Sequence, residues 1–173
     1  MNKNHYLKTT INVWGEGDRD VSFLRYLYSL YHVHGRELKI NNAHGGDPEC
    51  QIRQMIKYYN TTAFDEKYAL YDLDRGIESV TKARELAAPQ GIVCVESDRC
   101  LETELIRIMT TDAKLLKQAK KSSNDAKNAL AKLCHLKNVD SEVDWKKWAP
   151  KGMLDMKCKE SRWLKKILKI IRG

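Results

Sequence analysis

The chain has 173 residues, of which 42% are hydrophobic and 31% are charged, so it can bury a core as one domain or as one domain with an appendage. No apolar run approaches the roughly 18 residues of a membrane span, and the first residues contain no apolar signal-peptide core. The five cysteines form no Cys-x-x-Cys pair, which excludes a zinc ribbon and a thioredoxin-type motif. We therefore expect a cytoplasmic protein without a membrane partner.

The net charge of +8 is unevenly distributed along the chain. Residues 1–110 contain 14 Lys and Arg against 16 Asp and Glu, a net charge of −2, whereas residues 111–173 contain 17 against 7, a net charge of +10. This asymmetry predicts acidic chemistry in a first domain, 1–110, and attraction to a polyanion in a basic helical extension, 111–173. A solvated, lysine-rich helical face is the alternative explanation of the second part.

Predicted strands and helices alternate through the first 110 residues. Short β-branched or apolar runs predict strands at residues 8–14, 36–43, 67–72 and 92–95. Apolar residues at three- and four-residue spacing predict helices at residues 20–33, 48–59, 77–88 and 101–109. This alternation is typical of the α/β class, so we expect a parallel sheet of about four strands that is flanked by helices and joined by right-handed crossovers.

The second part of the chain is predicted to be helical. Residues 113–136 have helical spacing throughout, whereas residues 144–156 are less regular. Residues 163–171 carry one apolar stripe with basic flanks. We expect this last helix to dock on its own domain, although a membrane surface or a partner helix would suit the same pattern.

Carboxylates follow three of the predicted strands. Glu16 follows the first, Asp72 and Asp74 follow the third, and Asp98 and Glu102 follow the fourth. Because the carboxyl ends of parallel strands share one edge, where ligands bind, we expect these side chains to lie close together. The alternative for the Asp-x-Asp pair alone is a turn or a helix cap.

Such a cluster of like charges is best tolerated when a cation neutralises it. Ligands that are all oxygen favour a hard ion, Mg²⁺ or Mn²⁺, over zinc. Ions held there could activate water and stabilise the leaving oxygen of a phosphodiester.

Basic side chains near these strand ends or in the second part are candidates for phosphate contacts. Arg75 and Arg99 lie next to the acidic positions and could clamp a phosphate, or could equally form surface ion pairs. Four lysines fall at three- and four-residue steps on one predicted helix face, as in a phosphate-tracking stripe or an ordinary solvated face: Lys114, Lys117, Lys120 and Lys121.

The acidic motifs resemble a known family. Gly15-Glu16-Gly17-Asp18-Arg19-Asp20, a helix and then Asp72-Leu73-Asp74 resemble the TOPRIM domain of topoisomerases, primases and OLD-type nucleases, which hold magnesium with such residues. The closer resemblance is to RloB-like proteins, a TOPRIM branch of bacterial anti-phage systems. It is carried by the acid at position 20, by Gly45-Gly46-Asp47-Pro48 and by Ser97-Asp98-Arg99-Cys100-Leu101-Glu102, and it covers about residues 8–110.

The chain departs from the RloB-like pattern at several positions. Asp20 replaces a glutamate, Asp98-Arg99 replaces Asn-Pro, and Glu104 stands where the family has a tryptophan. The shorter carboxylate at position 20 bears on the geometry of a bound metal.

The resemblance implies a Mg²⁺-dependent nuclease that acts as the effector of an anti-phage system beside an ABC-type or AAA-type ATPase partner. Its catalytic residues would be Glu16, Asp72 and Asp74, and its metal ligands or their orienting residues would also include Asp20 and Glu102. The substrate would be DNA or RNA, with transfer RNA among the alternatives, and water would be the nucleophile. The rival interpretation is a non-catalytic, TOPRIM-derived nucleic-acid-binding or regulatory subunit of an ATPase complex. The oligomeric state is left open, with a homo-oligomer among the alternatives.

Overall fold

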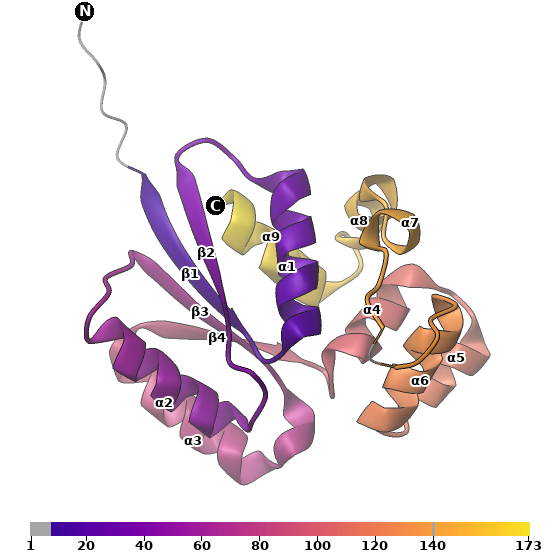
Figure 1. The fold of residues 1–173 in the computed structure, drawn as a ribbon, viewed down its shortest axis with the longest axis horizontal. Coiled ribbons are helices and arrows are strands. Elements are labelled where there is room, and N and C mark those ends of the chain that lie inside the picture. Colours follow the sequence, from indigo (N-terminus) through magenta and orange to yellow (C-terminus); the bar gives the residue numbers. More distant parts are fainter. Residues whose placement is uncertain (1–7, 140) are drawn as a thin grey trace, which may run out of the picture.

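The computed structural model describes residues 8–139 and 141–173, with Arg75 described by its backbone alone. This part of the chain contains one sheet, built from β1 (Thr9–Gly15), β2 (Arg36–Asn42), β3 (Glu66–Asp72) and β4 (Ile92–Ser97). All neighbouring strands are parallel, in the order β2-β1-β3-β4 (Figure 1). The predicted α/β class with a four-stranded parallel sheet is therefore confirmed.

The helices predicted in the first 110 residues are all present, with ends shifted by no more than two residues. They are α1 (Asp18–Tyr31), α2 (Pro48–Tyr59), α3 (Ile77–Ala87) and α4 (Leu101–Met109). Two short 3-10 turns, η1 (Leu73–Arg75) and η2 (Ala88–Gln90), flank α3. The start of α2 follows from its sequence: Pro48 suits a first helical turn, and the Asp47 carboxylate accepts a hydrogen bond from the Cys50 backbone N–H at 2.8 Å.

The second part contains α5 (Ala113–Ala119), α6 (Ser123–Leu133), α7 (Trp145–Trp148), α8 (Lys151–Lys157) and α9 (Arg162–Arg172). The helical spacing over residues 113–136 does not correspond to one helix, because the chain turns between α5 and α6. The Ser122 hydroxyl accepts a hydrogen bond from the Asp125 N–H at 3.0 Å, which starts a new helix. Hydrophobic periodicity in the sequence does not indicate such a helix cap.

The sheet separates two hydrophobic clusters, because alternate residues of a strand point to opposite faces. Ile11, Val13 and Leu70 pack against α1, α4 and α9 on one face, whereas Trp14, Ala69 and Tyr71 pack against α2 and α3 on the other. Figure 1 shows α2 and α3 together on one side of the sheet, opposite α1 and α9.

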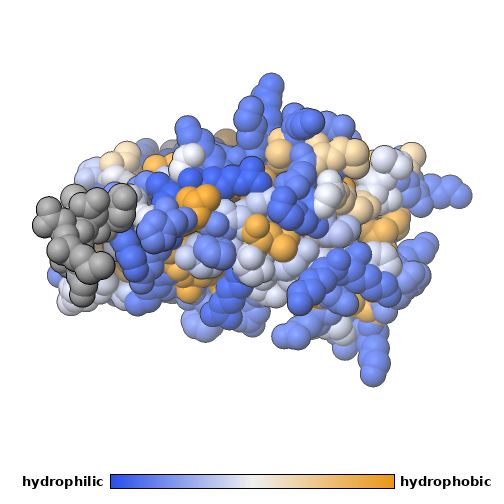
Figure 2. Space-filling model, turned by 90° about the horizontal axis from the view of Figure 1, so that it is seen from above, coloured by the Kyte–Doolittle hydropathy of each residue, from blue (hydrophilic) through white to orange (hydrophobic). Residues whose placement is uncertain are grey.

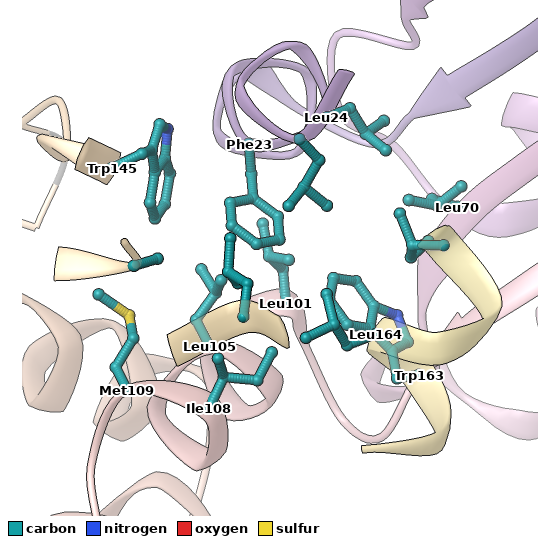
Figure 3. Close-up of a cluster of buried hydrophobic side chains, with 14 of the residues drawn as sticks. Phe23, Leu24, Leu70, Leu101, Leu105, Ile108, Met109, Trp145, Trp163 and Leu164 are labelled. Atoms are coloured by element: carbon teal, nitrogen blue, oxygen red, sulfur yellow. The ribbon is translucent and has the colours of Figure 1, made fainter. Parts of the chain in front are cut away.

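The larger cluster is shared by the two parts of the chain. Phe23 of α1 lies between Trp145 of α7 and Trp163 of α9, with ring centroids 4.9 Å and 6.2 Å away (Figure 3). The apolar stripe of α9 is buried, and α9 contacts α1, β2 and β4. The last helix therefore docks on its own sheet, as expected, and residues 111–173 share one core with residues 8–110.

None of the helices in the described part of the chain combines the length and the apolar character that a membrane span needs. The face in Figure 2 is mostly hydrophilic, and its hydrophobic side chains form only small separate patches.

Candidate functional site

The turn between β1 and α1 brings two carboxylates together. A Cβ on Gly15 would lie 2.6 Å from the Cβ of Asp20, so only glycine allows the strand end to approach the first turn of α1 this closely. The Asp20 carboxylate accepts a hydrogen bond from the Gly17 N–H at 3.1 Å and is buried, with 8% of the residue exposed. Asp20 is thereby held beside the strand end that carries Glu16.

The neighbouring strand β3 adds Asp72 to this pair. The Asp72 N–H donates to Glu16 Oε2 at 3.2 Å, which joins the end of β3 to the end of β1. Asp72 Oδ1 accepts a hydrogen bond from the Leu101 N–H at 3.0 Å, at the first residue of α4. The next residue, Glu102, is only 5% exposed. Sheet topology thus gathers carboxylates from four places in the sequence at one edge.

A cavity of about 370 Å³ opens at this edge. Its walls include four of the five predicted metal ligands: Glu16, Asp20, Asp72 and Glu102. The remaining walls come partly from the second half of the chain, through Lys127, Ser141, Glu142, Val143 and Trp145. The basic and acidic parts of the chain therefore meet at one site, whereas the sequence suggested separate tasks for them.

Burial and mutual repulsion raise the pKa values of two of the carboxyls. Burial, followed by the charges of Glu16 and Glu102, raises the pKa of Asp20 to about 7. Burial, followed by the charges of Asp20 and Glu16, raises the pKa of Asp72 to about 9. A bound cation would favour the ionised form of both carboxyls and so oppose these increases in pKa.

Arg19 provides a positive charge within the cavity. Its Nη1 lies 2.6 Å from Glu102 Oε1, and its Nη2 donates to the backbone carbonyl of Val139. Arg19 was not among the predicted site residues, because nothing in its position on a helical face distinguishes it from a solvated arginine. Its partner Glu102 is 83 residues away in the sequence.

The fifth predicted ligand, Asp74, lies apart from the other four. It is exposed in η1 and accepts a hydrogen bond from the hydroxyl of Ser123, the first residue of α6. Its charge still contributes to the raised pKa of Asp72. The structure therefore places Asp74 next to the cluster and against α6, outside the walls of the cavity.

The end of β4 contributes less to this site than its sequence suggested. Arg107 Nη2 lies 2.5 Å from Asp98 Oδ2, and both residues line a second cavity of about 500 Å³. Arg99 is partly exposed with a φ of 74°, and it does not line the acidic cavity. The side chain of Arg75 lies outside the described part of the structure.

The four predicted phosphate-binding lysines do not share one helical face. Lys114 and Lys117 lie on α5, whereas Lys120 and Lys121 lie in the turn that leads to α6. All four are exposed, and none lines the acidic cavity. Lys127 of α6 does line it, which the sequence could not indicate because the placement of α6 over the strand ends is a tertiary feature.

The donor set of this edge fits a hard divalent cation, since it consists of carboxylate oxygens whose charges repel one another. Within residues 8–139 and 141–173, however, no three His, Cys, Asp or Glu side chains are already arranged as a metal-holding group. Their oxygens are engaged instead with backbone N–H groups and with Arg19. A cation would therefore have to displace internal contacts.

Comparison of the chain with family models, with curated proteins and with solved structures finds no match.

Proposed function

We propose that this chain is a Mg²⁺-dependent nuclease of the TOPRIM type, which hydrolyses phosphodiester bonds of DNA or RNA with water as the nucleophile. The observation that carries this proposal is the convergence of Glu16, Asp20, Asp72 and Glu102 on one cavity from two strand ends and two helix starts. Burying carboxylates that repel one another costs stability, and a bound cation would offset that cost.

The order of the motifs supports the TOPRIM assignment. A glutamate after the first strand and an Asp-x-Asp after the third lie on neighbouring strands, β1 and β3. The hydrogen bond between Asp72 N–H and Glu16 ties these two motifs directly. The proposed ATPase partner and the role in anti-phage defence rest on the RloB-like resemblance of residues 8–110.

The residues divide the proposed chemistry between them. Glu16, Asp20 and Asp72 would hold the cation, with Glu102 as a further ligand and Asp74 at the rim. The bound ion would supply Lewis acidity and an activated water. Lys127, on the cavity wall, would contact the phosphate.

One observation favours the rival function, a TOPRIM-derived binding or regulatory subunit without catalysis. Arg19 already neutralises Glu102 at 2.6 Å, so the edge can exist without a metal. Under this function the chain would bind nucleic acid or an ATPase independently of divalent cations.

Cleavage of supercoiled plasmid DNA and of total transfer RNA, with Mg²⁺ or Mn²⁺ and with EDTA, separates the two functions. We expect the wild type to cut one of these substrates, and we expect Glu16→Gln and Asp72→Asn to lose more than about 100-fold of that rate. Glu37→Gln is the matched control, because Glu37 is exposed at the opposite end of the sheet. Cutting that survives in Asp72→Asn would contradict the proposal, as would metal-independent binding without any turnover when the ATPase partner is supplied.

A further inference from the structure

The exposed face of α9 carries only basic side chains. The apolar stripe of this helix is buried, and Figure 3 shows Trp163 and Leu164 among the buried side chains of the core. The exposed residues between the two ends of α9 form its basic face: Arg162, Lys165, Lys166, Lys169 and Arg172. Because the apolar stripe is already covered by the protein itself, the basic face is the surface that α9 offers to a partner.

The basic face lacks the ion pairs that other helices of this chain form between their own residues. The exposed sides of α2, α3 and α8 combine opposite charges four residues apart: Glu49 with Arg53, Glu78 with Lys82, and Lys151 with Asp155. The segment Arg162–Arg172 contains no acidic residue, and Lys165 and Lys169 place like charges four residues apart, which destabilises a helix. Arg162 stands in the first turn, where the helix dipole disfavours a positive charge. A bound polyanion would relieve this repulsion.

Nearby carboxylates do little to neutralise the basic face. Arg172 lies 3.6 Å from Asp155, which already pairs with Lys151 at 2.6 Å. Within the described part of the chain, Arg162, Lys165 and Lys169 form no ion pair. The carboxylates of the adjacent 500 Å³ cavity are each held by an arginine or lysine outside the basic face: Glu96, Asp98, Glu104 and Glu160.

The surface beside the basic face is hollowed. Arg162 and Lys166 line the cavity of about 500 Å³, and Lys166 and Lys169 line a third cavity of about 420 Å³. Lys166 Nζ donates to the Cys94 carbonyl at 3.0 Å, which places the basic face beside the edge strand β4. Leu73 lines the same cavity as Arg162 and directly follows Asp72 in the sequence. The basic face therefore borders concave surfaces, and its first turn lies near the acidic edge.

The dimensions and chemistry of the basic face fit the backbone of a duplex. From Arg162 to Arg172 the helix rises about 15 Å, at about 1.5 Å per residue. This length matches about four successive phosphates of one strand of a duplex, at about 3.4 Å each along its axis. Single strands are usually held by aromatic side chains on which their bases stack, and none of the exposed residues of α9 is aromatic.

We propose that the basic face of α9 binds the phosphate backbone of a nucleic-acid duplex without the help of a divalent cation. This inference deepens the proposed function, on which it rests for the cleavage of the bound duplex, by naming the substrate class and the surface that holds it.

The first test is binding of a fluorescently labelled DNA duplex, measured by fluorescence anisotropy in EDTA at several KCl concentrations. We expect Lys165→Gln/Lys169→Gln to bind the duplex about tenfold more weakly than the wild type at about 100 mM KCl. The slope of log K against log salt should become shallower by about 2, since each lost phosphate contact removes about 1. The control is Lys57→Gln/Lys82→Gln, which removes the same charge from exposed positions of α2 and α3 on the opposite face of the sheet. This control should keep the affinity within about twofold.

Thermal unfolding separates binding from a structural role of the two lysines. Because Lys165→Gln/Lys169→Gln removes like charges from neighbouring helical positions, it should unfold at the same temperature as the wild type or at a higher one. A clearly lower unfolding temperature together with weaker binding would assign these lysines to the fold and overturn the inference.

The remaining outcomes separate this inference from the proposed function. Equal duplex affinity and an equal salt slope in the wild type and Lys165→Gln/Lys169→Gln would overturn the role of the basic face and leave the nuclease proposal standing. Duplex binding that depends on the basic face, without cleavage by the wild type in Mg²⁺, would support this surface while the nuclease proposal fails. Tighter binding to a single strand of the same length, or binding to phosphatidylserine vesicles but not to the duplex, would overturn the inference.

Discussion

Two cavities lined by carboxylates lie near the carboxyl ends of the strands, and they neutralise these carboxylates in different ways. In the larger one, Glu96 is held by Arg84 at 2.7 Å, and both Asp98 and Glu104 are held by Arg107. The Arg84 hydrogen bonds lower the pKa of Glu96. In the smaller one, the pKa values of Asp20 and Asp72 are raised.

The contrast shows that acidic residues after a parallel strand do not by themselves mark a functional site. Arginine partners turn the acids at the end of β4 into structural ion pairs. The cluster around Asp72 has fewer such partners than carboxylates among the described residues, so its unbalanced charge distinguishes it as a candidate for a cation.

The largest expected effect is on cleavage. Asp72→Asn should lower the rate more than about 100-fold, because it removes a proposed metal ligand. Glu96→Gln, the corresponding change in the other cavity, should keep the rate within about threefold, since Glu96 does not line the acidic cavity. The measurement is single-turnover cleavage in Mg²⁺; equal losses in both variants would remove the distinction between the cavities.

Removing an arginine from the larger cavity leaves a buried carboxylate there without its cationic partner, and the effect on stability can be measured. Arg107→Ala leaves Glu104, which is 6% exposed, without its cationic partner, and we expect a loss of about 2–3 kcal/mol at pH 8. Burial already raises the pKa of Glu104, so the loss should shrink towards pH 4 as this carboxyl becomes protonated in the folded protein. Urea unfolding at both pH values measures this, and a loss independent of pH would point to packing alone.

At Asp72, in the absence of metal, we expect a substitution to stabilise the protein rather than to destabilise it. The pKa of Asp72 is about 9 in the folded chain, above its ordinary value of 3.8, so its contribution to stability declines as pH rises from about 4 to 9. Asp72→Asn removes the titratable group, and with it the cost of its raised pKa, and keeps an oxygen for the Leu101 N–H. It should be more stable than the wild type by about 1–2 kcal/mol at pH 8 in EDTA, and by less at pH 5.

Urea unfolding in EDTA at these two pH values measures the difference in the free energy of unfolding between Asp72→Asn and the wild type. Saturating Mg²⁺ should make this difference smaller, because it stabilises only the wild type. A variant that is less stable than the wild type at pH 8 would mean that the Asp72 charge is already well compensated.

The smallest effect is expected for Glu96→Gln on stability. The pair with Arg84 is partly exposed, so its loss should cost less than about 1 kcal/mol at pH 7. Because the pKa of Glu96 is lowered in the folded state, this contribution is present above the ordinary value near 4.5 and disappears as the pH falls below it. Thermal unfolding at pH 7 and pH 3 measures it, and an equal cost at both would exclude a charge effect.

The sequence by itself determined the class of the fold and most of its elements. Hydrophobic periodicity is local, so strands could be predicted at residues 8–14, 36–43, 67–72 and 92–95, within two residues of their observed ends, and helices in the intervening segments. The rule that parallel strands share one carboxyl edge then predicted that Glu16 and Asp72 would meet.

Only the tertiary structure decided which charges are compensated. Arg107 takes Asp98 away from the acidic edge, while Arg19 reaches Glu102 across 83 residues and Lys127 arrives with α6. The helical pattern of the sequence likewise continues through Ser122, although a new helix, α6, starts there. The first residue of α6, Ser123, contacts Asp74. Periodicity reports which face of an element is buried, whereas the partner of a charged side chain depends on how distant elements pack together.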